Sequence, residues 1–243
     1  MKPFDDKPAV LLTGASRGLG RALFEELARA GARVVGVARD ADAISRAAAE
    51  LCAQGLEAHG LGADVGDQHE IFRIAGAAAA LVGPIDVLVH NASTLGPTPL
   101  RLLSDTDCED FERTLQVNLL GPFRLSKAVA GHMLLAGSGL IVSISSDAAT
   151  SAYPGWGAYG VSKAALDHLG RIWAAELAGS GVRFLSIDPG EMDTDMHRAA
   201  LPEADPATLT APADVARRIV RVLERSETVP SGTRLDAAQL EAA

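Results

Sequence analysis

A tyrosine and a lysine stand four positions apart, as Tyr159 and Lys163, in a segment with helical character. Side chains at positions i and i+4 project from one face of an α-helix, so we expect the phenol and the ammonium to be neighbours. A nearby positive charge favours phenolate and lowers a tyrosine pKa from its ordinary value of about 10. A phenol tuned in this way suits reversible proton transfer at a carbonyl or alcohol oxygen.

Two further polar residues could join this pair. Ser146 follows an apolar run and precedes Tyr159 by 13 positions, so its O–H could point into the same cleft. Asn118 interrupts an otherwise apolar helical pattern, and a mid-helix asparagine lowers helix propensity unless its side chain has a partner. A surface tyrosine beside a surface lysine, and a satisfied core asparagine, remain the alternative interpretations.

Three glycines, Gly14, Gly18 and Gly20, are spaced GxxxGxG directly after the first apolar run. At a strand-to-helix junction such glycines permit a tight turn, a close approach to a pyrophosphate and close packing of the helix on the strand. The spacing alone is weakly specific, and a packing turn at a helix start is the alternative. No Gly-Lys-Ser/Thr follows, which argues against a P-loop.

The end of the second apolar run indicates which dinucleotide would bind. A carboxylate there accepts the ribose 2′-OH of NAD, whereas arginine accommodates the 2′-phosphate of NADP. Here Ala38 is followed by Arg39, which could clamp a phosphate together with Arg17. Asp40 could instead reach the ribose or pair with Arg39. The sequence therefore favours NADP(H) over NAD(H).

Short apolar runs alternate with Ala/Leu-rich helical stretches along the whole chain. We predict strands at Ala9–Leu12, Arg33–Val37, Glu57–Leu61, Val87–His90, Gly139–Ser143 and Arg183–Ile187, and helices at 18–30, 41–53, 67–82, 106–136, 158–179 and 212–226. Continuous apolar strands alternating with helices are typical of a parallel sheet covered on both faces. The fold class is therefore α/β, a doubly wound Rossmann-type sheet in one domain spanning 1–243, with ligands beyond the carboxyl ends of the strands.

Composition argues against several classes of protein. The formal net charge is −9 and the arginines form no long block, so nucleic acid and anionic membrane are poor partners. The longest apolar stretch, 74–85, is shorter than the roughly 20 residues of a membrane span. With no secretion signal visible and only 2 cysteines, Cys52 and Cys108, we expect a soluble cytoplasmic protein with buried free thiols. No group of residues has metal-ligand spacing, so no metal is predicted.

Taken together, these motifs resemble the short-chain dehydrogenase/reductase family over essentially the whole chain. The family's TGxxxGxG matches Thr13 to Gly20, and its Asn–Ser–Tyr–Lys tetrad matches Asn118, Ser146, Tyr159 and Lys163. The coenzyme residues expected from the motifs and the resemblance are Gly14, Ser16, Arg17, Gly18, Leu19, Gly20, Arg39, Asp64, Val65, Asn91, Ala92, Tyr159, Lys163, Pro189, Gly190 and Thr194. One departure is clear, because the family's Asn-Asn-Ala-Gly run reads His90-Asn91-Ala92-Ser93 here, which places a side chain near the nicotinamide ribose.

The resemblance implies reduction of a small-molecule carbonyl by hydride from NADPH, or the reverse oxidation. Tyr159 would protonate the developing alkoxide, and Ser146 would hydrogen-bond the same oxygen. Lys163 would hold the nicotinamide ribose and lower the tyrosine pKa, and Asn118 would position a water that resupplies the proton through Lys163. Two other functions remain open: an NAD(H)-linked secondary-alcohol dehydrogenase and a non-catalytic dinucleotide-sensing protein.

The substrate pocket is predicted to be apolar and partly aromatic, which suits a flat or aromatic ketone or diketone. Its expected lining residues are Ser93, Ala148, Tyr153, Trp156, Met192 and Met196. Gly155-Trp156 and Asp193–Met196 resemble sepiapterin reductase and benzil reductase-like members, although the acidic anchor of the pterin enzymes has no match around Gln239. The family also implies a homodimer or homotetramer, formed through the long helices near 106–131 and 158–178.

Overall fold

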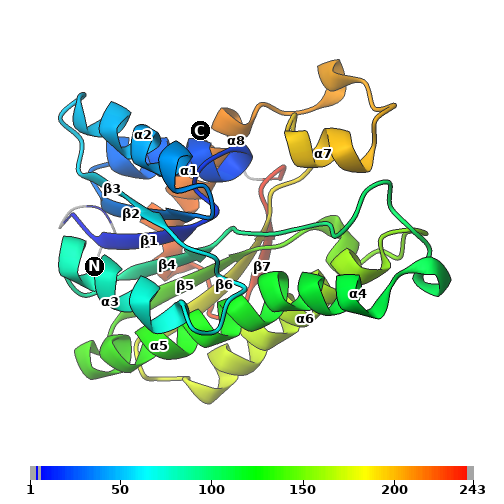
Figure 1. Cartoon of the computed structure of the whole chain (residues 1–243). Coiled ribbons are helices and arrows are strands. Elements are labelled where there is room, and N and C mark those ends of the chain that lie inside the picture. Colours follow the sequence, from blue (N-terminus) through cyan, green and yellow to red (C-terminus); the bar gives the residue numbers. More distant parts are fainter. Residues whose placement is uncertain (1–3, 5–6, 240–243) are drawn as a thin grey trace.

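The computed structural model describes Phe4 and residues 7–239, and within them seven parallel strands form one sheet in the order β3-β2-β1-β4-β5-β6-β7 (Figure 1). The strands are β1 (Ala9–Thr13), β2 (Arg33–Ala38), β3 (Ala58–Gly62), β4 (Val87–His90), β5 (Gly139–Ile144), β6 (Val182–Asp188) and β7 (Arg234–Asp236). Each neighbouring pair is parallel. The order of the first six strands is that of the doubly wound dinucleotide-binding folds, which confirms the predicted fold class.

Helices cover both faces of this sheet (Figure 1). They are α1 (Gly18–Arg29), α2 (Ala41–Cys52), α3 (Ile71–Val82), α4 (Cys108–Leu115), α5 (Gly121–Ala136), α6 (Gly157–Glu176), α7 (Asp195–Ala200) and α8 (Pro212–Glu224). The apolar sides of α1, α2 and α8 pack in one cluster, and those of α3, α5 and α6 pack in another. β1 supplies both clusters, since Val10 and Leu12 face the first while Ala9 and Leu11 face the second. Burial on both faces explains why the strand is apolar at every position.

The predicted helix 106–136 is interrupted in the structure. A π-helical turn, Gln116–Leu120, separates α4 from α5, and the Gly121 N–H donates to the Gln116 carbonyl. Pro122 has no N–H and therefore cannot donate the usual helical bond to the carbonyl of Asn118. The interruption lies at the asparagine that the sequence singles out.

Two elements near the site were not predicted. Helix α7 is six residues long, and β7 is three residues long and pairs with the end of β6, Ser186 opposite Arg234. Both are too short to give a periodic apolar pattern.

The prediction of buried thiols is wrong, because Cys52 and Cys108 are free but exposed at the end of α2 and the start of α4. In the part of the chain that the structure describes, no helix is both long and apolar enough to span a membrane.

Candidate active site

The loop between β1 and α1 forms the floor of a cleft at the carboxyl ends of the strands. Gly14 and Gly18 have φ values of +72° and +53°, which side-chain-bearing residues rarely adopt. A Cβ on Gly20 would lie 1.9 Å from the Gly14 carbonyl oxygen. Each of the three glycines is therefore required by the backbone path, as expected of a loop that cradles a pyrophosphate at a helix N-terminus.

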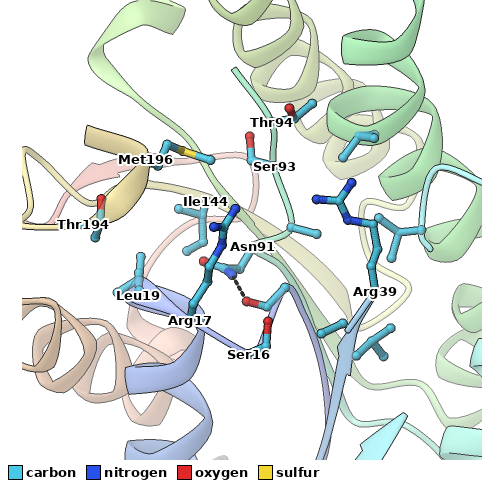
Figure 2. Close-up of a pocket in the computed structure, with 18 of the residues that line it drawn as sticks. Ser16, Arg17, Leu19, Arg39, Asn91, Ser93, Thr94, Ile144, Thr194 and Met196 are labelled. Atoms are coloured by element: carbon cyan, nitrogen blue, oxygen red, sulfur yellow. Dashed lines mark hydrogen bonds between the residues drawn. The ribbon is translucent and has the colours of Figure 1, made fainter. Parts of the chain in front are cut away.

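Residues after β4 hold this loop in place. The Asn91 side-chain N–H₂ donates to the carbonyl of Thr13 at 3.0 Å and to that of Gly14 at 3.1 Å. Figure 2 shows a hydrogen bond from Asn91 to the glycine loop. The Thr13 hydroxyl in turn accepts the N–H groups of Asn91 and Ala92, both at 3.1 Å. The Asn91 side chain, predicted to bind coenzyme, is thus engaged in shaping the glycine loop.

Most of the predicted coenzyme residues line one cleft. The cleft lining includes Gly14, Ser16, Arg17, Gly18, Leu19, Gly20, Arg39, Asp64, Val65, Asn91, Ala92, Tyr159, Lys163, Pro189 and Thr194, together with Ser93. Gly190 lines the adjoining cavity instead. The buried hydroxyl oxygen of Ser93, the residue that replaces the family glycine, has no hydrogen-bond partner among the described residues. This orphaned oxygen and the glycine cradle fit a polar ligand of dinucleotide size.

Two arginines give the cleft its positive charge. Figure 2 shows both guanidinium groups in the cleft, Arg17 from the loop before α1 and Arg39 from the end of β2. Neither side chain has a hydrogen bond or ion pair with another described residue. Asp40, the competing carboxylate, is engaged as the N-cap of α2, where it accepts the Ala43 N–H at 2.9 Å.

Asp64 follows β3 and lines the same cleft. Burial alone would raise the pKa of its carboxyl, but hydrogen bonds from the Gly66 N–H and from Arg113 outweigh burial and hold the pKa below its ordinary value. The sequence analysis missed Arg113, which lies 49 positions from Asp64 with no motif linking the two. The carboxylate at this position is therefore an anchored acceptor.

Tyr159 and Lys163 lie side by side on α6, as their spacing predicts. Both are buried, at 7% and 2% exposure, and the ammonium nitrogen is 5.5 Å from the centre of the phenol ring. Lys163 Nζ donates to the carbonyl of Ile144 at the end of β5, at 2.7 Å. Helix and strand together therefore fix the position of the ammonium.

The tyrosine pKa differs from the expectation. Burial raises the pKa of the Tyr159 phenol to about 12; the Ser146 hydroxyl opposes the rise, and the carboxylates of Asp147 and Asp188 add to it. Burial also lowers the pKa of Lys163 to about 8, against the pull of Asp167 and Asp188. The prediction that the tyrosine pKa is lowered is wrong for this structure, because desolvation of the phenol is the largest effect and raises the pKa. The protonated phenol is the dominant form at neutral pH.

Asn118 and Ser146 flank this pair. The Asn118 side chain accepts the Thr94 N–H at 2.9 Å and donates to the Thr94 carbonyl and the Ser162 hydroxyl, at 2.8 and 2.9 Å. It is a satisfied buried asparagine that ties the segment after β4 to α6. The Ser146 hydroxyl donates to Asp147 Oδ1 at 2.9 Å and lines the adjoining cavity.

A second cavity of about 470 Å³ adjoins the cleft, and Tyr159 lines both. Its apolar wall consists of Leu95, Tyr153, Trp156, Met192, Met196, Ala200 and Leu201. Two predicted lining residues lie elsewhere: Ser93 lines the coenzyme cleft, and Ala148 packs behind the wall against Leu95 and Tyr159. Ala148 is directed inward because its N–H is held by the Ser146 hydroxyl and the Asp147 carboxylate.

The cavity also contains carboxylates that the sequence analysis did not place there. Asp147, Asp188, Glu191 and Asp236 line it, and neither lysine nor arginine does among the described residues. Asp236 comes from β7, three positions before Gln239, where no acidic anchor was expected. Within that same described part, no three His, Cys, Asp or Glu side chains are grouped to hold a metal ion.

Curated relatives share much of this chain. The first, glycine betaine reductase ATRR of Emericella nidulans, is 33% identical over 93% of this chain, which spans only 18% of that longer protein. An NADPH-dependent aldehyde reductase-like protein of Arabidopsis thaliana chloroplasts is 34% identical, over 76% of this chain and 73% of its own length.

Solved structures agree with the fold and differ in coenzyme. Actinorhodin polyketide ketoreductase with NADPH superposes with a TM-score of 0.86 and 26% identity, covering 95% of both chains. 7α-Hydroxysteroid dehydrogenase with NADH and 7-oxo glycochenodeoxycholic acid superposes with a TM-score of 0.85 and 29% identity, covering 94% of this chain and 92% of its own.

The family model described as short chain dehydrogenase matches residues 8–205, which include the glycine loop, the tyrosine–lysine pair and the strand ends between them. The local likeness to sepiapterin and benzil reductases stays a prediction. The chain belongs to the short-chain dehydrogenase family.

Proposed function

We propose that this oxidoreductase reduces the carbonyl of a ketone or diketone to a secondary alcohol with NADPH. The observation that carries the proposal is the place of Tyr159, whose buried phenol lines both the coenzyme cleft and the apolar cavity. A carbonyl carbon near the cleft and its oxygen near the phenol could then receive hydride and proton together. When bound in the cleft, a reduced nicotinamide supplies the hydride.

The choice of NADPH is supported by Arg17 and Arg39. Both line the cleft without a hydrogen bond or ion pair to another described residue, and the Asp40 carboxylate caps α2 instead of pairing with Arg39. A guanidinium pairs well with the phosphate that distinguishes NADP from NAD. An NAD(H)-linked alcohol dehydrogenase is the second candidate, favoured by the NADH-bound structural relative.

For the chemical step, each residue of the tetrad has a distinct role. Tyr159 donates its proton to the carbonyl oxygen, and its raised pKa keeps that proton available at neutral pH. The Ser146 hydroxyl turns from Asp147 toward the same oxygen and stabilises its developing negative charge. Lys163 places a positive charge beside the phenolate that remains after transfer.

The proton that Tyr159 gives up is replaced through Lys163. The Asn118 side chain is fully engaged, so we assign water binding to its backbone carbonyl, which Pro122 leaves without the usual helical donor. A water held there could pass a proton to Lys163.

The cavity favours an uncharged, partly flat substrate. Trp156 stands edge-on to both Tyr153 and Tyr159, with ring centres 6.4 and 5.7 Å apart, so the wall is aromatic beside the reacting phenol. Of the four lining carboxylates, Asp188 is paired with Arg234, and the other three have no arginine or lysine partner among the described residues and oppose an anionic substrate. A neutral aromatic ketone or diketone therefore fits better than a keto acid or a phosphorylated ketone.

We also propose a homo-oligomer formed through α5 and α6. Phe123, Val161 and Ile172 are large apolar side chains exposed on these helices, at 38%, 47% and 43%. A monomeric mass in light scattering at micromolar concentration contradicts this assembly.

The test of function is a panel of aromatic ketones, diketones and keto acids with NADPH or NADH, followed at 340 nm. We expect turnover with neutral ketones and NADPH, and little with keto acids. Faster turnover with NADH supports the second candidate. Tight NADPH binding without turnover on any carbonyl or alcohol indicates the non-catalytic sensor instead.

A further inference from the structure

Beneath the tetrad lies a cluster of buried charges organised by one residue of the last strand, Arg234 on β7. Its Nη2 donates to Asp188 Oδ2 at 2.8 Å and to the Ser146 carbonyl at 2.9 Å. Its Nε donates to Asp167 Oδ2 at 3.1 Å. One guanidinium thus joins the ends of β5 and β6 to α6.

We propose that Arg234 is a positioning residue for the reaction: it holds the Ser146 peptide and neutralises the two carboxylates that lie beneath Tyr159 and Lys163. The proposal rests on the proposed function, because the reaction is what the positioning serves. A planar guanidinium suits this task, since its fixed N–H donors can reach three acceptors at once.

The first part of the argument is geometric. Ser146 carries the hydroxyl that faces the phenol, and its own carbonyl accepts from Arg234. Its neighbour Ser145 donates through its hydroxyl to Asp167 Oδ2 at 2.7 Å, the oxygen that Arg234 also contacts. Loss of the guanidinium removes the anchor of the Ser146 peptide and one partner of Asp167.

The second part concerns charge. Asp147 in the turn after β5 and Asp188 at the end of β6 act on the phenol, and Asp167 on α6 and Asp188 act on Lys163. Arg234 on β7 pairs with Asp167 and Asp188. Asp167 and Asp188 are 4% and 7% exposed, so each needs a partner to stay ionised. With Arg234 present, two buried carboxylates are balanced by two cations. Without Arg234, Lys163 alone faces both at neutral pH, and above the Lys163 pKa of about 8 neither carboxylate has a cation beside it.

The direction of the effect follows from this balance. An uncompensated carboxylate disfavours phenolate, so removal of Arg234 should raise the pH needed to ionise Tyr159. Removal of the Asp188 charge should have the opposite effect, and the two changes together should largely cancel. A merely structural arginine predicts no such pattern.

The experiment compares Arg234→Met, Arg234→Lys, Asp188→Asn and the double variant Arg234→Met/Asp188→Asn. The matched control is Arg183→Met on β6, because Arg183 is half-buried and also binds a backbone carbonyl, that of Val229, away from the cleft. One readout is the pH at half-maximal kcat for alcohol oxidation, which requires the phenolate. Melting curves and far-ultraviolet circular dichroism verify folding of every variant.

For Arg234→Met we expect this midpoint to rise by about 0.5 to 1 unit and kcat for ketone reduction at pH 7 to fall about tenfold. The KM for NADPH should stay within about threefold, because Arg234 does not line the coenzyme cleft. Arg234→Lys should recover part of both losses. Asp188→Asn should lower the midpoint, and the double variant should return it close to that of the unmodified chain.

A second readout does not depend on catalysis. The chain has 2 tyrosines, so in a Tyr153→Phe background the phenolate absorbance at 295 nm reports Tyr159 alone. Because burial already raises the pKa of Tyr159 to about 12, the arm followed here is Asp188→Asn, which should shift this titration downward even if no ketone is ever turned over. This result separates failure of this proposal from failure of the proposed function. If Arg234→Met does not fold, Arg234→Lys and Asp188→Asn carry the test with opposite expected shifts. Midpoints unchanged in all variants, as in Arg183→Met, overturn the proposal.

Discussion

Arg39 offers the sharpest test of coenzyme choice, through the substitution Arg39→Ala. The guanidinium lies at the end of β2, exposed in the cleft; it has no hydrogen bond or ion pair with a described residue, and only its charge acts on the nearby Asp64 carboxylate. Its removal therefore breaks no contact of the folded chain, and the thermal midpoint should not change. The expected loss falls on binding of the 2′-phosphate alone.

The magnitude follows from the type of contact. A hydrogen bond to a charged group contributes about 1.5 to 3 kcal/mol. Because Arg39 is exposed and screened by salt, we take the lower half of that range, about 1.5 to 2 kcal/mol. At about 1.4 kcal/mol per tenfold change, the Kd for NADPH should rise roughly 10- to 30-fold, while the Kd for NADH stays unchanged.

The assay is fluorescence or calorimetric titration of each coenzyme at 50 and 500 mM salt. Arg46→Ala is the matched control, since Arg46 is exposed on α2, does not line the cleft and removes the same formal charge. We expect salt to weaken NADPH binding more in the unmodified chain than in Arg39→Ala. Equal losses for NADPH and NADH, or an equal loss in Arg46→Ala, refute the reasoning.

Three further predictions concern a buried histidine and two residues of the cleft. Burial lowers the pKa of His90 to about 3, so between pH 6.5 and 3 the unfolded chain binds one more proton, and the free energy of unfolding decreases as the pH falls. In urea unfolding at pH 7 and 5, this decrease should be smaller in His90→Asn than in the unmodified chain, by up to about 1.4 kcal/mol per pH unit. Gly20→Ala should abolish NADPH binding and lower the melting midpoint, whereas Gly131→Ala, where a Cβ meets nothing within 4 Å, should raise it. Ser93→Ala should weaken NADPH binding about fivefold in titrations, because it removes the orphaned hydroxyl.

Five of the predicted strands, β1, β2, β4, β5 and β6, were readable because they are apolar runs buried along almost their whole length, whereas β3 is only partly buried. All six predicted strands begin and end within one residue of the observed ones, and Val87–His90 matches at both ends. By contrast, β7 contains Arg234, Leu235 and Asp236, two charges in three residues, and has no apolar signal. This strand is defined by its pairing with β6, a contact between distant parts of the chain that local sequence does not encode.

Within the site, local motifs were readable and long-range contacts were not. The i, i+4 spacing correctly placed Tyr159 beside Lys163, because that relation belongs to the helix itself. The tyrosine pKa was misjudged because its dominant cause is burial, which depends on the packing of other elements. Arg234 was missed for a related reason, since 67 positions separate it from Asp167.

The measurement that tests the central claim most directly is ketone reduction by Tyr159→Phe, with NADPH binding determined on the same sample. The claim is that the phenol proton goes to the carbonyl oxygen. We expect turnover to fall by about 100- to 10,000-fold, as for loss of a general acid, while the Kd for NADPH changes by less than about threefold. Turnover equal to that of the unmodified chain, with coenzyme still bound, contradicts the account.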